Sequence, residues 1–161
     1  MLKFVDNVVT FSEIPDEISL CINISNCPYR CDGCHSSYLW KDIGQELTKV
    51  TLVDLLRTNS GITTVCFMGG DNDLKSLYEL FNYVLENYPK LKVAWYTGRK
   101  DFPVGVPKIH YIKIGPYLKD RGPITNPNTN QMFFTLGSVM KKMDANGNLY
   151  YDTTDKFWNK E

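Results

Sequence analysis

Three of the five cysteines in this chain follow the spacing Cys27-x-x-x-Cys31-x-x-Cys34, directly after the apolar, strand-like run Leu20–Ser25. This spacing holds three thiols on one short loop at the end of a strand, and it leaves a fourth coordination position without an obvious protein ligand. An iron–sulfur cube takes four ligands, which are usually cysteine thiolates. The loop therefore predicts a 4Fe-4S cluster bound by Cys27, Cys31 and Cys34, with one iron free to bind another molecule.

Two other uses of these cysteines are weaker. A disulfide framework is disfavoured by the odd number of cysteines, by the length of the chain and by the expectation that no signal peptide precedes Met1. A zinc-binding interaction module without catalysis is the stronger alternative, since His35 adds a nitrogen to the three sulfurs. However, ligands on adjacent residues rarely converge on one tetrahedral ion, and the usual second Cys/His pair is missing. Cys21 and Cys66 lie inside apolar runs, and we expect them to be small buried hydrophobes outside the site.

Length and composition predict one compact domain over residues 1–161. The chain is 43% hydrophobic, which is enough for a core of its own. Its apolar runs are much shorter than the roughly 18 residues that a membrane span requires, so we expect a soluble, cytoplasmic protein. Eighteen basic residues balance eighteen acidic ones, which leaves no electrostatic footprint for nucleic acid. This balance favours a protein or a small molecule as the partner.

Strand-like and helix-like segments alternate along the chain. Four short apolar runs, rich in β-branched and aromatic residues, are typical of buried parallel strands: Leu20–Ser25, Ile62–Met68, Leu91–Tyr96 and Ile109–Ile114. An apolar stripe at three- and four-residue steps predicts a helix from Leu74 to Tyr88, closed by Pro89, and a shorter helix is predicted over Thr51–Arg57. The alternation indicates an α/β fold in which helices pack on a parallel sheet.

The segments that follow the four predicted strands carry the functional information. They are the cysteine loop, Gly69-Gly70-Asp71, Thr97-Gly98-Arg99 and Gly115-Pro116. In parallel α/β folds these segments all emerge at the carboxyl end of the sheet, where ligands bind, so we expect them to converge on one site. Glycine allows the backbone to approach a ligand closely, and Gly69 and Gly70 are therefore expected to present main-chain groups to it. The sequence has no phosphate-binding fingerprint, which disfavours a nucleotide kinase or a Rossmann dehydrogenase.

The cysteine loop, Cys27 to Ser36 followed by Leu39-Trp40, resembles the cluster loop of the radical S-adenosylmethionine superfamily. Within that superfamily it is most similar to the activating protein of the anaerobic (class III) ribonucleoside-triphosphate reductase, which carries a glycine at the position of Gly33. Gly69-Gly70-Asp71 looks like the segment whose backbone contacts the amino group of S-adenosylmethionine. Further similar segments follow in the same order, and the resemblance runs from about Ser19 to Phe134: Trp95-Tyr96-Thr97-Gly98, Ile114-Gly115-Pro116-Tyr117 and Thr129-Asn130-Gln131.

This resemblance implies a fold, two cofactors and an activity. The fold would be a partial (β/α) barrel of the radical S-adenosylmethionine type, open on one side for a protein segment. A reduced 4Fe-4S cluster would cleave S-adenosylmethionine to methionine and a 5′-deoxyadenosyl radical, which removes hydrogen from a glycine of the reductase large subunit. The implied partners are that subunit and an electron donor. The implied cofactor-binding residues are Gly33, Cys34, His35, Gly69, Gly70 and Asp71, and the candidate contacts to a carboxylate or ribose are Arg99, Lys113 and Arg121.

One alternative within the same superfamily stays open. It is a small radical S-adenosylmethionine enzyme with a small-molecule substrate, resembling 7-carboxy-7-deazaguanine synthase, whose relatives usually lengthen or alter the cysteine loop. Beyond Phe134 the chain matches no segment of either family. There Asn146-Gly147, a strong two-residue turn signal, predicts a C-terminal β-hairpin over Val139–Tyr151.

Overall fold

Four parallel strands form the centre of the sheet in the computed structural model, which describes all residues except 138–141, 144–146, 148 and 159–161. The strands are β2 (Ser19–Ile24), β4 (Thr64–Met68), β5 (Lys92–Tyr96) and β6 (Tyr111–Ile114). Each pairs in parallel with the next, as the sequence predicts. Their nearly continuous apolar character follows from burial of the central strands on both faces.

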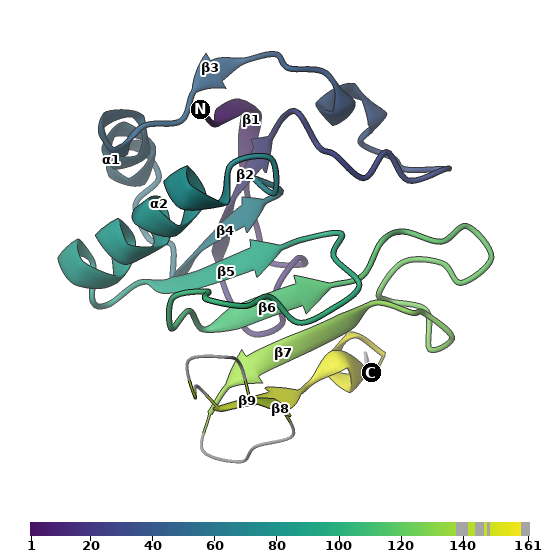
Figure 1. Cartoon of the computed structure of the whole chain (residues 1–161). Helices are drawn as coiled ribbons and strands as arrows, with labels where there is room; N and C mark the ends of the chain where they lie inside the picture. The colour runs from purple at the N-terminus through teal and green to yellow at the C-terminus, as the bar shows by residue number, and fades with distance from the viewer. Residues whose placement is uncertain (138–141, 144–146, 148, 159–161) are drawn as a thin grey trace.

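Antiparallel strands extend the sheet on both sides of this centre. On one side lie β1 (Lys3–Thr10) and β3 (Gln45–Glu46), and on the other β7 (Met132–Leu136), β9 (Leu149–Asp152) and β8 (Lys142–Met143). The described residues thus form one nine-stranded sheet in the order β3-β1-β2-β4-β5-β6-β7-β9-β8 (Figure 1). β8 and β9 pair antiparallel, as expected for the C-terminal hairpin, while Asn146 of its predicted turn lies outside the described residues. The sheet is mixed, and the curvature of a partial barrel stays a prediction.

Two helices pack on the same face of the sheet. α1 (Lys49–Thr58) begins at Thr48, whose side chain caps the first turn, and α2 (Leu74–Asn87) begins at Asp73, whose carboxylate accepts from the backbone N–H of Ser76. Both include the ranges that the sequence predicts, apart from the last residue, Tyr88. However, residues 97–110, between β5 and β6, form no helix, so the predicted alternation is incomplete. No helix in the described part of the chain is long and apolar enough to cross a lipid bilayer.

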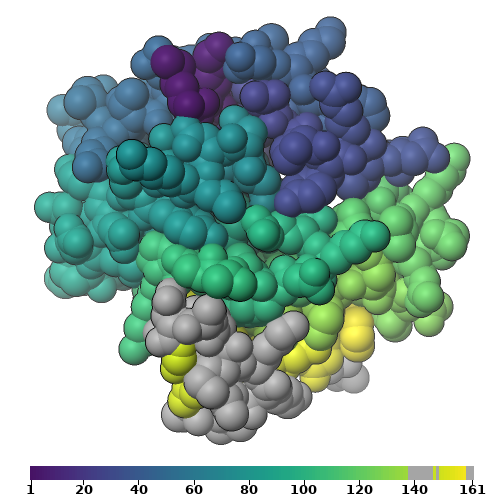
Figure 2. All heavy atoms as spheres, viewed as in Figure 1, coloured from purple at the N-terminus to yellow at the C-terminus, as the bar shows by residue number. Residues whose placement is uncertain are grey.

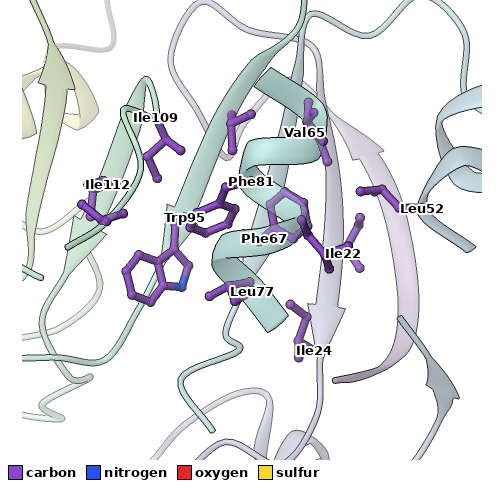
Figure 3. Close-up of a cluster of buried hydrophobic side chains, with 14 of the residues drawn as sticks. Ile22, Ile24, Leu52, Val65, Phe67, Leu77, Phe81, Trp95, Ile109 and Ile112 are labelled. Carbon is purple, nitrogen blue, oxygen red and sulfur yellow. The ribbon is translucent and has the colours of Figure 1, made fainter. Parts of the chain in front are cut away.

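The two faces of the sheet are covered by different parts of the chain. On the helix face, Leu77 and Phe81 of α2 point toward Phe67 and Trp95 (Figure 3), and the ring of Phe81 lies 5.1 Å from that of Phe67. The opposite face carries the alternate side chains of the strands and is covered by segments from both ends of the chain and by the loop after β6. This second cluster contains Ile14, Cys21, Cys66, Ala94, Tyr96, Ile124, Phe133 and Phe157. Cys21 and Cys66 are therefore buried hydrophobes, as predicted.

Glu17 is a buried carboxylate at the amino-terminal end of the parallel strands, with 6% of its surface exposed. It forms an ion pair with Lys92 and accepts hydrogen bonds from Tyr111 and from the hydroxyls of Thr63 and Thr64. Burial alone would raise its pKa, but these four partners together lower the pKa to about 2. Glu17 thus joins β4, β5 and β6 at the end of the sheet away from the cysteine loop.

We expect Glu17→Gln to lower the free energy of unfolding by about 2 kcal/mol at neutral pH, because a charged acceptor of several hydrogen bonds is lost. The pKa of Glu17 is lowered from its ordinary value of 4.5. Its stabilising contribution is therefore fully present above pH 4.5 and disappears as the pH falls through about 2. The difference between the wild type and the variant should therefore vanish across that range in urea titrations. Glu86→Gln, at an exposed position of α2, is the control. A pH-independent difference would contradict this role.

Candidate functional site

A cavity of about 200 Å³ lies at the carboxyl end of the four parallel strands. Segments that follow all four strands line it, and they include Cys27, Cys31, Cys34, Gly69, Asp71, Thr97, Gly98 and Gly115. Figure 1 shows the loops after β2 and β6 extending from the same end of the sheet. The prediction that the four turns converge on one site is confirmed.

The cysteine loop is wound by residues in the left-handed backbone region. Asn26, Arg30 and Gly33 have φ values of 61°, 46° and 76°. The loop is fixed at its base, where the N–H of Cys27 donates to the carbonyl of Leu39 at 2.9 Å. Glycine adopts this conformation without strain, which explains Gly33 between the second and third cysteines. The winding turns three partly buried thiols toward one cavity.

Backbone N–H groups point at two of these thiols. The N–H of Ser36 lies 3.4 Å from Sγ of Cys34, and the N–H groups of Tyr29 and Arg30 face the thiol of Cys27. Burial raises the pKa of Cys27, and these two N–H groups oppose the rise. Donors of this kind stabilise thiolates and the sulfur ligands of iron–sulfur clusters.

The donor set fits an iron–sulfur cluster with one open iron. The first cavity offers three thiols, and no histidine is among its described lining residues. Ile24, Leu39 and Met68 supply apolar walls. Among the described residues, no three His, Cys, Asp or Glu side chains lie close enough together to hold a single metal ion.

Gly69 and Gly70 have different surroundings: the first lines the cavity and the second packs against α2. Gly69 lines the cavity, but its N–H donates to the carbonyl of Tyr96 and its own carbonyl accepts from Nε1 of Trp95, both at 2.9 Å. One lone pair of that carbonyl is left for a ligand. Gly70 does not line the cavity. It has a φ of +96°, and a Cβ there would lie 2.9 Å from Leu77. The geometry therefore assigns Gly70 a packing role under α2, which differs from the expected ligand contact.

Asp71 is the carboxylate of the cavity and links two of its walls. It accepts hydrogen bonds from the hydroxyl of Tyr29 at 3.1 Å and from Oγ1 of Thr97 at 2.6 Å. Burial raises the pKa of Asp71, while the two hydroxyls and Arg99 oppose the rise. The ring of Tyr29 lies against Gly98, where an added Cβ would come within 2.7 Å of it. Asp71 and Tyr29 thus connect the cysteine loop to the end of β5.

Gly33 and His35, the remaining predicted cofactor residues, lie at the exposed rim. A Cβ on Gly33 would lie 3.3 Å from Tyr117, and the ring of His35 lies 5.9 Å from the Tyr117 ring. Neither residue lines the first cavity. These contacts bring the cysteine loop beside the loop after β6, and Figure 2 shows the two next to each other at one end of the molecule.

His35 instead lines a second, larger cavity of about 460 Å³. The two cavities are adjacent, and they share the residues Cys34, Ser36, Tyr96, Lys113, Tyr117 and Gln131. Sequence reasoning missed the second cavity, because its walls come from both ends of the chain. Lys113, a lysine in an otherwise apolar strand, was the available signal. Of the other two candidate cations, Arg121 donates to the carbonyl of Asn128 and, like Arg99, lines neither cavity.

The site and the fold define the class of protein. Three thiols on one loop, facing a cavity at the carboxyl edge of a parallel sheet, are the features of an iron–sulfur protein. The chain matches the family model of the 4Fe-4S single cluster domain over residues 18–102, which is more than half of its length, and it belongs to this family. No curated protein and no solved structure matches the chain.

The packing role of Gly70 can be tested by the stability of a variant protein. We expect Gly70→Ala to lower the free energy of unfolding by about 2–4 kcal/mol, because the methyl group would be held in a left-handed conformation and crowd Leu77. Gly61→Ala is the matched control, since Gly61 has a φ of +82° and nothing within 4 Å of its added Cβ. It should cost only about 1–2 kcal/mol in the same urea titration. If both variants lost the same free energy of unfolding and Gly70→Ala bound S-adenosylmethionine more weakly, Gly70 would be a ligand-binding residue instead.

Proposed function

We propose that this chain is a radical S-adenosylmethionine activating protein that generates a glycyl radical on the large subunit of an anaerobic ribonucleoside-triphosphate reductase. One observation carries the proposal. The three-thiol loop faces Gly69 and Asp71 across a single cavity, and no histidine or fourth cysteine is among the described residues that line it. Membership of the 4Fe-4S single cluster family and the resemblance of the cysteine loop both support it.

The proposed roles follow from the positions of the side chains. Cys27, Cys31 and Cys34 hold the cluster, which when bound supplies one electron for breaking a carbon–sulfur bond of S-adenosylmethionine, so that hydrogen is removed from the partner's glycine. Asp71 accepts a charge-assisted hydrogen bond from the amino group of S-adenosylmethionine. Its hydrogen bonds from Tyr29 and Thr97 fix the carboxylate in advance. The apolar walls exclude water and other hydrogen donors.

We assign the substrate to the second cavity, beside the cavity that would hold the cofactors. Most of its lining residues fall outside the family match at 18–102: Ser12, Glu13, Lys113, Tyr117, Pro123, Ile124, Thr125, Gln131 and Phe157. Because these residues lie outside the segment that the family shares, we assign substrate selection to this second cavity. The resemblance favours a peptide segment of the reductase as the occupant. The cavity volume also suits a small molecule, which keeps a small-molecule radical S-adenosylmethionine enzyme as the second candidate.

The ligand assignment is tested by replacing cysteines one at a time. After anaerobic reconstitution, Cys27→Ala, Cys31→Ala and Cys34→Ala should each lose most of the bound iron and sulfide and the brown colour, because each removes one of three anchors. Cys21→Ala and Cys66→Ala are the controls and should keep both, since these thiols are buried in the core. A full cluster in Cys31→Ala would contradict the assignment. A colourless wild type that binds zinc would favour the zinc module.

The activity is tested with the reductase from the same source. The chain, S-adenosylmethionine, a chemical reductant and the reductase large subunit are mixed without oxygen. We expect a glycyl-radical doublet in the electron paramagnetic resonance spectrum and a higher yield of 5′-deoxyadenosine than without the reductase. The Cys31→Ala chain and a reductase whose radical glycine is replaced by alanine are the controls. Cleavage of S-adenosylmethionine that leaves the reductase without a radical would favour the small-molecule enzyme.

A further inference from the structure

Lys113 is a cation placed between the two cavities. It lies in the middle of β6, beside Tyr96 in the register of β5, and its side chain lines both cavities. Its Nζ lies 4.5 Å from the centroid of the Tyr96 ring, which holds the ammonium over the ring face. Among the described residues that line the first cavity, Lys113 is the one cationic side chain.

The ammonium of Lys113 has no ion pair and no hydrogen bond within the part of the chain that the structure describes. Lys92, one strand away, shows the contrast, because it pairs directly with Glu17. Burial lowers the pKa of Lys113, and the groups that oppose this effect are Glu13 and the cysteines Cys66, Cys34 and Cys31. Two of these are proposed cluster ligands. A half-buried cation without an ion pair is stabilised by nearby negative charge, which Glu13 and the reduced cluster would both provide.

We propose that the Lys113 ammonium is a positioning charge that raises the reduction potential of the cluster held by Cys27, Cys31 and Cys34. This inference rests on the ligand assignment made under the proposed function. On reduction the cluster takes one electron from an external one-electron reductant and becomes more negative by one unit of charge. A nearby cation stabilises this reduced form more than the oxidised form, and water screens the interaction weakly inside a cavity. Net charge around an iron–sulfur cluster is one of the factors that set its potential.

The test is a redox titration of the reconstituted protein without S-adenosylmethionine. Lys113→Met and Lys113→Gln remove the charge, whereas Lys113→Arg keeps it. We expect the equilibrium constant for reduction of the cluster to be at least tenfold lower in the two neutral variants than in the wild type. For one electron this is a shift of the reduction potential by about 59 mV to a more negative value. Lys113→Arg should differ from the wild type by less than threefold. Lys90→Met changes the net charge equally at an exposed position beyond α2 and should leave the potential unchanged.

Iron and sulfide content separates the outcomes. Unchanged potentials in fully loaded Lys113→Met and Lys113→Gln would overturn the inference, including the case in which these variants bind S-adenosylmethionine more weakly. If both neutral variants load incompletely, Glu13→Gln gives a test of opposite sign. Removing this carboxylate should raise the potential, and the absence of a rise would overturn the inference. A wild type that binds no cluster would contradict the ligand assignment itself.

Discussion

The parallel pairing of β2, β4, β5 and β6 is the constraint on which the rest of the structure depends. Because the four strands run in one direction, the turns that follow them begin at the same edge of the sheet. Cys34, Asp71, Thr97 and Gly115 come from distant parts of the chain, and this pairing brings them to one cavity. A shift of one residue in any register would turn that strand's side chains to the opposite face and dismantle the cavity wall.

The two faces of the sheet divide stability from chemistry. The helix face is a conventional core, in which α2 buries aromatic rings against Phe67 and Trp95. The opposite face carries Tyr96 and Lys113 at its carboxyl end, and Ile14 and Phe157, from the two ends of the chain, cover the rest of it. The family match covers the cysteine loop but neither of these covering segments. These covering segments therefore lie outside the part of the chain that the family match defines.

The sequence allows the central strands, both helices and the convergence of the turns to be predicted, since each depends on local pattern or on parallel topology. β1 escaped notice because its segment contains Asp6 and Asn7 and is exposed over much of its length, so no continuous apolar run marks it. The absent helix between β5 and β6 was predictable, because Pro103, Gly105 and Pro107 interrupt that stretch.

The roles of Gly70 and Lys113 required the three-dimensional structure. A glycine after a strand has the same sequence signature whether it faces a ligand or a helix, and only the packing of Leu77 distinguishes the two. The surroundings of Lys113 likewise come from loops far away in the sequence, so the absence of an ion pair to Lys113 among the described residues cannot be read from β6 alone.

The two edge strands, β3 and β8, have a consequence for how a partner can bind. Each contains two residues in the described part of the chain. β3 pairs only with Lys3 and Phe4 of β1, so the stretch from Asp6 to Thr10 has no partner strand on that side among the described residues. A free strand edge of this kind is open to pairing with a strand of another chain. Because Thr10 lies opposite Ser19, this free edge runs toward the amino-terminal end of the parallel strands, and a strand added there would leave both cavities open.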